Sequence, residues 1–136
     1  MVRNIVTDIS SARIPSVPAT KYDVHIALDL YDTLDEMRYE CAGLSANMIG
    51  VNKRIIAVQT RRGIMLMMNP TILKKHWKYE IGEASVSISG IRRVTRYKII
   101  KVEYEDIKFN KHVNIFVGLT AQIIQHEVDH CNGIII

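Results

Sequence analysis

The sequence has few cysteines and no long apolar run. Two cysteines, Cys41 and Cys131, cannot build a disulfide framework, so a disulfide-stapled secreted scaffold is excluded and a reduced, cytoplasmic compartment is expected. The longest aliphatic run, residues 64–68, is far shorter than a membrane span, so no membrane contact is expected. No apolar segment follows the first charged residues, and a secretory signal is therefore not expected.

What is present is an ordinary globular composition. Hydrophobic residues make up 48% and charged residues 24% of the chain, which excludes the disordered and fibrous classes. The length of 136 residues suits one domain over residues 1–136, large enough to bury a core without disulfides or metal. The formal net charge of +4 permits a polyanionic neighbour without requiring one.

Hydrophobic spacing predicts two helices that flank a set of strands. Residues 21–39 repeat apolar side chains every three or four positions, and residues 119–131 return to that spacing. Four runs rich in β-branched and apolar residues predict strands at 54–59, 64–69, 97–104 and 112–117. Pro70 is expected to end the second strand, and residues 61–63 predict a hairpin turn. This order favours an α+β fold, with short antiparallel strands packed around a C-terminal helix.

The strongest chemical signal lies on that last helix, in His126-Glu127-Val128-Asp129-His130. Residues four apart lie one turn apart on one helix face, so His126 and His130 can bind one metal ion. Glu127 lies beside that face, where its carboxylate can move a proton between water and a leaving amine. The alternative is a pair of surface histidines on a charged helix, and a metal site would also need a third protein ligand.

Three ordered segments make the chain resemble the peptide deformylases, metal hydrolases that remove the formyl group from the initiator methionine of new proteins. The segments are residues 43–50, 83–87 and 126–130, which are similar to the family motifs G-x-G-L-A-A-x-Q, E-G-C-L-S and H-E-x-D-H. The resemblance covers nearly the whole chain. It implies a divalent metal cofactor, Fe(II) or Zn(II), and an N-formyl-Met peptide as the substrate.

The residues that differ from the family pattern stand at positions with chemical roles. Ser85 stands at the position of the family's cysteine ligand, and a neutral hydroxyl binds such a metal more weakly than a thiolate does. Met48 stands at the position of a glutamine that donates to the developing oxyanion, which a thioether cannot do. The backbone amide of Val86, the other expected donor, needs no particular side chain. The resemblance therefore assigns Ser85 to the metal and Glu127, Met48 and Val86 to catalysis, with weakened activity.

Other side chains near these motifs leave alternatives open. Cys41 stands where the family has its first motif glycine, and it either reaches the metal or is a small core residue. Cys131, five residues after His126, lies well around the helix from the site. Asp129 is expected to fix a neighbouring backbone or side chain. A serine-hydrolase site around Ser85 is disfavoured because no nucleophile elbow accompanies it.

The same resemblance also indicates which residues bind the substrate. Gly43 and Leu44 lie in the first matched segment, and Arg92 or Arg93 stands where the family has an arginine that holds the peptide backbone. The alternative is a solvated basic edge strand over residues 92–101. A peptide is expected to pair with a free strand edge near residues 88–90. Apolar candidates for the methionine pocket are Leu44, Met65, Met67 and Met68.

The resulting hypothesis is a divergent deformylase, and the alternative is a non-catalytic paralogue that binds peptide N-termini or a partner protein. Ser85 and Met48 favour the paralogue, whereas the intact His126, Glu127 and His130 favour the enzyme. A family that acts on nascent chains also implies a transient ribosome contact, for which the basic stretches 74–78 and 92–101 are candidates. No base-reading motif accompanies these stretches, so sequence-specific nucleic-acid binding is not expected.

Overall fold

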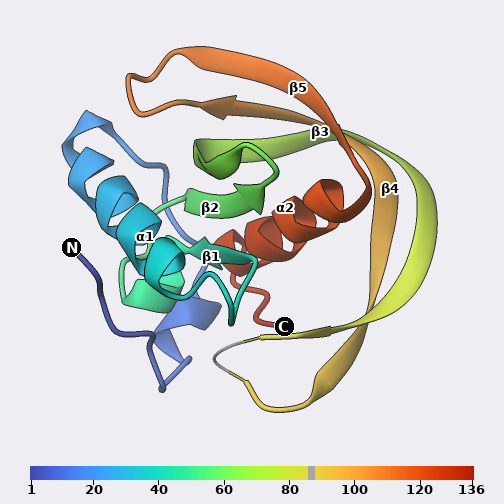
Figure 1. Ribbon diagram of the computed structural model, residues 1–136, viewed down its shortest axis with the longest axis horizontal. Helices are drawn as coiled ribbons and strands as arrows, with labels where there is room; N and C mark the ends of the chain where they lie inside the picture. Colours follow the sequence, from blue (N-terminus) through green and yellow to red (C-terminus); the bar gives the residue numbers. More distant parts are fainter. Residues whose placement is uncertain (86–87) are drawn as a thin grey trace.

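The computed structural model describes residues 1–85 and 88–136, which form one five-stranded sheet and two α-helices (Figure 1). The helices are α1, Val24–Glu36, and α2, Gly118–Cys131, with shorter 3-10 turns at Ser11–Arg13, Lys21–Asp23 and Ala46–Ile49. The strands are β1 Gly43–Ser45, β2 Ile55–Thr60, β3 Gly63–Ala84, β4 Ile91–Glu105 and β5 Lys111–Val117. Neighbouring strands pair antiparallel in the order β1-β2-β3-β4-β5, which confirms the predicted α+β class.

Strand β3 is longer than predicted, because Pro70 does not end it. Asn69 has a φ of 53°, and the pairing of β3 with β4 shifts register between Met68 and Thr71. Such an irregularity tolerates a proline, which lacks the N–H that a regular ladder needs. The Asn69 side chain secures the bend, since its Oδ1 accepts from the Ala19 N–H at 2.7 Å and its Nδ2 donates to the Ala19 carbonyl at 3.0 Å. The predicted strand end at Pro70 is therefore wrong, and the basic stretch 74–78 lies within a strand.

The β2–β3 connection is the hairpin that the sequence predicted. Thr60 pairs with Gly63 across it, so only Arg61 and Arg62 form the turn. Gly63 has a φ of 109°, a left-handed conformation that glycine adopts without the steric penalty of a Cβ.

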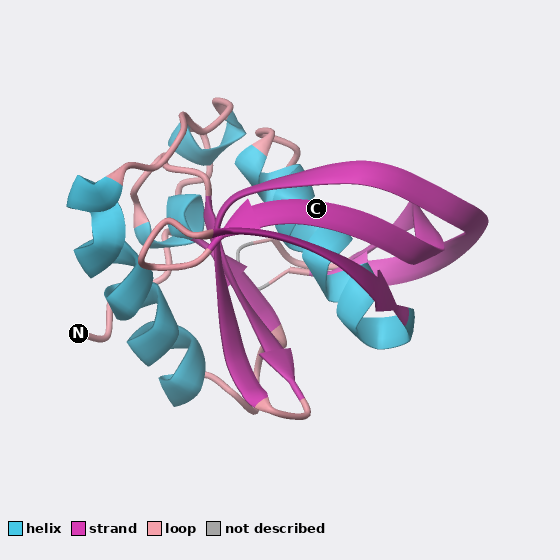
Figure 2. Ribbon diagram, turned by 90° about the horizontal axis from the view of Figure 1, so that it is seen from above, coloured by secondary structure: helices cyan, strands magenta, loops and turns pink. Residues whose placement is uncertain are grey.

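Strand β2 separates two hydrophobic clusters. Ile55 and Ala57 belong to the cluster beneath α1, whereas Ile56 and Val58 belong to the cluster beneath α2. This alternation follows from the two-residue side-chain period of a strand. Figure 2 accordingly shows α1 and α2 on opposite sides of the strands.

The predicted methionine-pocket residues fall largely in these clusters. Met67 and Met68 are fully buried on opposite sides of the sheet, and Met65 packs against the α2 cluster. Met67 and Met68 are therefore core residues, and none of the three methionines lines the cavity described below. Leu44 is also buried, but it lines the cavity described below.

The outer parts of β3 and β4 extend as a two-stranded arm that curves around α2 (Figure 1). Along the arm, β4 pairs with β3 from Ile91 to Tyr97, and it meets β5 only from Ile99 onward. The register at the far end places Glu83 opposite Arg92. No helix among the described residues is long and apolar enough to cross a membrane.

Candidate metal centre

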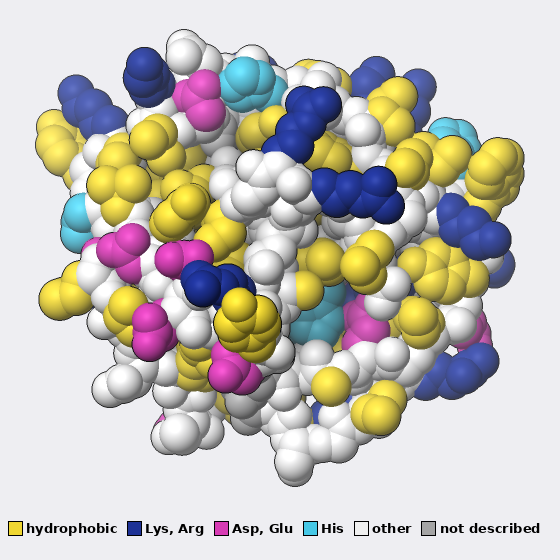
Figure 3. Space-filling view, in the orientation of Figure 1, with side chains coloured by type: hydrophobic (Ala, Val, Ile, Leu, Met, Phe, Trp, Pro, Cys, Tyr) yellow, Lys and Arg dark blue, Asp and Glu magenta, His cyan; other side chains and the backbone are white. Residues whose placement is uncertain are grey.

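A cavity of about 410 Å³ opens beside α2. Its walls are formed by residues 40–44, Met48, residues 82–85 and one face of α2. Figure 3 shows histidine and acidic side chains at the bottom of a hollow on this face of the molecule. The cavity thus joins parts of all three segments on which the family resemblance rests.

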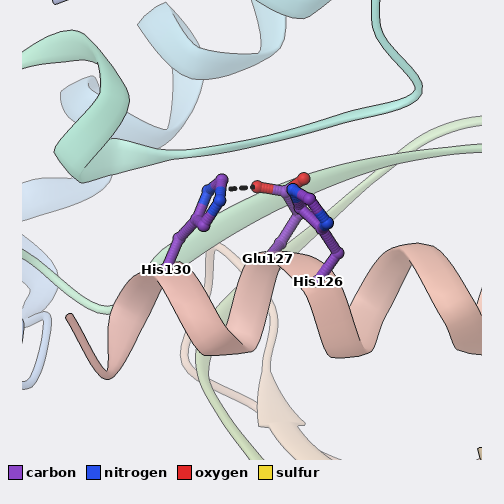
Figure 4. Close-up of side chains that lie close together, drawn as sticks. All are labelled: His126, Glu127 and His130. Carbon is purple, nitrogen blue, oxygen red and sulfur yellow. Dashed lines mark ion pairs between the residues drawn. The ribbon is translucent and has the colours of Figure 1, made fainter. Parts of the chain in front are cut away.

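His126, Glu127 and His130 point into this cavity from α2 (Figure 4). One potential ligand atom of each lies within 4.8 Å of those of the other two, and the imidazole centroids are 4.6 Å apart. The i, i+4 spacing of the histidines places them one turn apart, as the sequence predicted. The alternative of two unrelated surface histidines is excluded, because His130 is only 3% exposed.

Glu83 fixes the orientation of His126. The Nδ1 atom of His126 lies 2.7 Å from Oε1 of Glu83. A carboxylate only accepts, so Nδ1 carries the proton and Nε2 keeps the lone pair that a metal would need. Burial opposes ionisation of Glu83, but hydrogen bonds from His126, Arg96 and Gln122 outweigh it and lower the pKa of Glu83 to about 2.

Arg96 connects Glu83 to the far side of α2. Its guanidinium contacts Glu83 at 2.6 Å through Nη2 and Asp129 at 2.7 Å through Nη1. Asp129 therefore fixes a neighbouring side chain, in the supporting role expected for it. Arg96 is 4% exposed. Reading residues 92–101 as a solvated basic strand is therefore wrong at this position.

His130 lies deeper than His126. Its Nδ1 is 3.3 Å from both the Ser45 hydroxyl and Oε1 of Glu127, and its Nε2 is 3.4 Å from the Ile136 carbonyl. Burial disfavours the imidazolium, but the Glu127 carboxylate favours it more, and the pKa of His130 is raised. Asn47 ties this part of α2 to the β1 loop by donating to the His130 carbonyl at 2.7 Å.

Glu127 is a buried carboxylate with an unsatisfied oxygen. It is 4% exposed, and its Oε1 accepts no hydrogen bond from the described residues, although His130 Nδ1 is 3.3 Å away. Gly43 makes room for it, since a Cβ there would lie 3.0 Å from both Cγ and Oε2 of Glu127. A buried polar atom of this kind calls for a further partner, and a cation or a water molecule would supply one.

The remaining predicted site residues are distributed unevenly. Ser85, Met48 and Leu44 line the same cavity as the histidines. Val86 lies outside the described residues. Arg92 is exposed on β4, donates to the Ser89 carbonyl at 3.3 Å and does not line the cavity.

Neither cysteine is grouped with His126, Glu127 and His130 among the described residues. Cys41 does line the cavity. Burial and the nearby charge of Glu127 raise the pKa of the Cys41 thiol to about 11. Cys131 is buried in the cluster beneath α2.

Sequence reasoning missed three supporting side chains. The motif match includes Glu83 without indicating its role, and the sequence pattern indicates no role for Arg96 or Gln122. Gln122 donates to Glu83 at 2.9 Å and lies four residues before His126 on α2. That i, i+4 spacing is the signal that could have identified it. The role of Arg96 depends on the curvature of the arm and had no local signal.

Comparisons with known proteins agree with this geometry. A family model described as polypeptide deformylase matches residues 6–136. The peptide deformylase of Clostridium beijerinckii is 48% identical over 136 residues, which is 100% of both chains. The crystal structure of peptide deformylase from Thermotoga maritima superposes with a TM-score of 0.88 at 25% identity, covering 99% of this chain and 95% of that one.

A ligand-bound relative has the same fold. The actinonin-bound class I type b peptide deformylase from Acinetobacter baumannii superposes with a TM-score of 0.87 at 25% identity, covering 99% of this chain and 95% of that one. The matches extend over the helices, the sheet and the cavity alike. This chain belongs to the polypeptide deformylase family.

Proposed function

We propose that this chain removes the N-formyl group from N-formyl-methionyl peptides by metal-dependent hydrolysis. The observation that carries the proposal is the grouping of His126, Glu127 and His130 in the cavity beside α2. The full-length similarity to a named peptide deformylase supports an enzyme over the alternative, a non-catalytic peptide-binding paralogue.

The donor set fits a divalent cation. His126 is braced through Nδ1, which leaves Nε2 free to bind, and Glu127 carries a buried oxygen without a hydrogen bond among the described residues. We infer that His126 and His130 hold Fe(II) or Zn(II), with Ser85 as the third protein ligand. When bound, the ion would act as a Lewis acid that polarises the formyl carbonyl and makes water more acidic.

Glu127 is the proton carrier of the proposed reaction. It accepts a proton from the attacking water and returns it to the amide nitrogen as the C–N bond breaks, which releases formate and a free peptide amine. Its burial keeps this exchange away from bulk solvent. Glu83 and Arg96 contribute to the reaction indirectly, because they hold His126 in a single orientation.

Oxyanion stabilisation is the weak part of this site. The Val86 amide is assigned as one donor from the motif match alone. Met48 lines the cavity but has no N–H or O–H to donate. Losing one such donor lowers the rate by a factor on the order of 10²–10³. We therefore expect slower turnover than a glutamine at this position would give.

Substrate binding is assigned to the cavity wall. Gly43 and Leu44 would contact the peptide near the formyl group, and both line the cavity. Arg92 lies outside the lining, so its contact with the peptide backbone stays a prediction. A transient ribosome contact and a cytoplasmic location also stay predictions, the latter resting on two free cysteines.

The test is turnover of N-formyl-Met-Ala-Ser by anaerobically purified protein, with metal content measured in the same sample. Glu127→Ala is expected to abolish formate release. Glu36→Ala is the matched control, because Glu36 is exposed on α1 and remote from the cavity. Full activity of Glu127→Ala, or metal-loaded protein without turnover, would overturn the proposal.

A further inference from the structure

A second hollow lies next to the metal-site cavity. This apolar groove has a volume of about 540 Å³, and its apolar lining consists of Trp77, Tyr79, Ile99, Val117 and Leu119. Three of these side chains are strongly exposed, namely Trp77 at 70%, Leu119 at 69% and Val117 at 60%. Contiguous exposed apolar surface of this kind marks an interaction site in many soluble proteins.

The groove is continuous with the metal-site cavity. Leu119 and Gln122 line both hollows. The Tyr79 hydroxyl donates to Oε1 of Gln122 at 3.4 Å, and Nε2 of Gln122 donates to Glu83 at 2.9 Å. Since Glu83 also binds His126, one chain of hydrogen bonds runs from the groove wall to the metal site.

Trp77 combines an unusual backbone conformation with an exposed ring. Trp77 has a φ of 60°, which is a rare conformation for a bulky residue and costs of the order of 1–3 kcal/mol. It falls between the paired positions His76↔Ile99 and Lys78↔Tyr97, and the register of β3 with β4 is unchanged across it. The exposed Trp77 side chain lines the groove.

We propose that the apolar groove binds the downstream part of the substrate peptide and prefers apolar or aromatic side chains there. This inference rests on the proposed deformylase function and extends its site. The groove adjoins the cavity that would hold the formyl-methionine end, so the residues that follow this methionine are the natural occupant. A peptide leaving that cavity past Leu119 and Gln122 enters the groove directly.

Strand geometry gives the length of peptide required. Glu83 lies at the metal site, Tyr79 lies four residues before it along β3, and Trp77 lies six residues before it. An extended peptide advances about 3.3 Å per residue, as a strand does. A peptide whose first residue lies level with Glu83 therefore reaches Tyr79 with about its fifth residue and Trp77 with about its seventh.

The kinetic test compares formyl-Met peptides of three and seven residues. A heptapeptide with Phe at residues five and seven is expected to have a kcat/KM about 3- to 10-fold above that of the tripeptide, because its rings are removed from water in the groove. A heptapeptide with Ser at those positions should show little gain. Trp77→Ala is expected to remove the gain without affecting tripeptide turnover, and Trp77→Phe to keep part of it. Tyr22→Ala is the control, since Tyr22 is 77% exposed outside the groove.

A binding test separates this inference from the proposed function. Trp77 is the single tryptophan of the chain, so its fluorescence reports on the groove alone. In Glu127→Gln protein, the Phe-containing heptapeptide should shift Trp77 emission at concentrations where the tripeptide does not. That shift supports the groove even if the wild-type protein proves inactive on every formyl peptide.

Three results would overturn the inference. One is equal kcat/KM for the tripeptide and the Phe heptapeptide. Another is a Trp77 emission that no peptide changes. The third is a Trp77 emission that depends on protein concentration without peptide, because a second copy of the chain would then fill the groove.

Discussion

Gly43 lies against Glu127 so closely that a Cβ on Gly43 would be 3.0 Å from both Cγ and Oε2 of the carboxylate. Strand β1 and helix α2 therefore meet at the residue assigned to proton transfer. A glycine is required here for space, not for an unusual backbone angle, because Gly43 is not among the residues with positive φ. The position of the carboxylate thus depends on a missing side chain in another element.

Gly43→Ala is expected to lower turnover of a formyl-Met peptide by at least about tenfold, since a displacement of about 1 Å can already cost 10²-fold. The new methyl group would also lie 2.7 Å from Cγ2 of Ile123, so stability should fall by about 1–3 kcal/mol. Adding Ile123→Ala removes the 2.7 Å contact but not the two 3.0 Å contacts with Glu127, so activity should stay low. Unchanged turnover in Gly43→Ala protein would show that Glu127 does not need this space.

Glu83→Gln is expected to destabilise the fold strongly. Arg96 would lose the carboxylate at 2.6 Å while remaining buried and would keep only Asp129 as an ion-pair partner, and breaking a buried pair costs up to about 3–5 kcal/mol. Urea denaturation measures this loss. The matched control is Glu80→Gln, which removes an exposed pair with Arg93 and should change the free energy of unfolding by less than about 1 kcal/mol. Equal losses in the two variants would contradict the structural role of Glu83.

Stability should fall in acid through the protonation of Glu83. Its pKa is lowered from the ordinary 4.5 to about 2 in the folded protein, so its contribution is complete above pH 4.5 and is lost as pH falls toward 2. The contribution is on the order of 3 kcal/mol at neutral pH. Glu83→Gln should flatten this part of the stability curve.

Asp106 titrates in the same pH window, because hydrogen bonds from His112 and from the Asn110 backbone lower its pKa to about 2. Asp106→Asn protein therefore serves as the control, and it should keep the slope that Glu83 produces. If Glu83→Gln leaves the acid limb unchanged while Asp106→Asn flattens it, the assignment to Glu83 is wrong.

Ser85→Cys is expected to tighten binding of Zn(II) by on the order of tenfold or more, because a thiolate is a stronger and softer ligand than a hydroxyl. Competition with a chromophoric chelator measures the affinity without relying on turnover. Ser85→Ala shows how much the hydroxyl itself contributes. Zn(II) affinity that is the same in Ser85→Cys and Ser85→Ala would remove position 85 from the ligand set.

The sequence predicted the parts of the site that local spacing determines. His126 and His130 share a helix face because they are four residues apart, and the amphipathic pattern of residues 119–131 was enough to predict that helix. Arg96 was missed because its burial depends on the β3–β4 arm curving around α2, a contact between distant parts of the chain. Pro70 misled the prediction because the bulge at Asn69 that tolerates it is held by Ala19, fifty positions away.

The arm also makes the metal site sensitive to the number of residues in β4. Side chains along a strand alternate between faces, so a shift of one residue would turn Arg96 away from both Glu83 and Asp129. A deletion of one residue between Gly90 and Arg96 should therefore disturb the orientation of His126 as severely as a substitution within α2 would. A deletion of two residues keeps the arginine facing the helix, so length changes in this segment are expected to be tolerated in pairs.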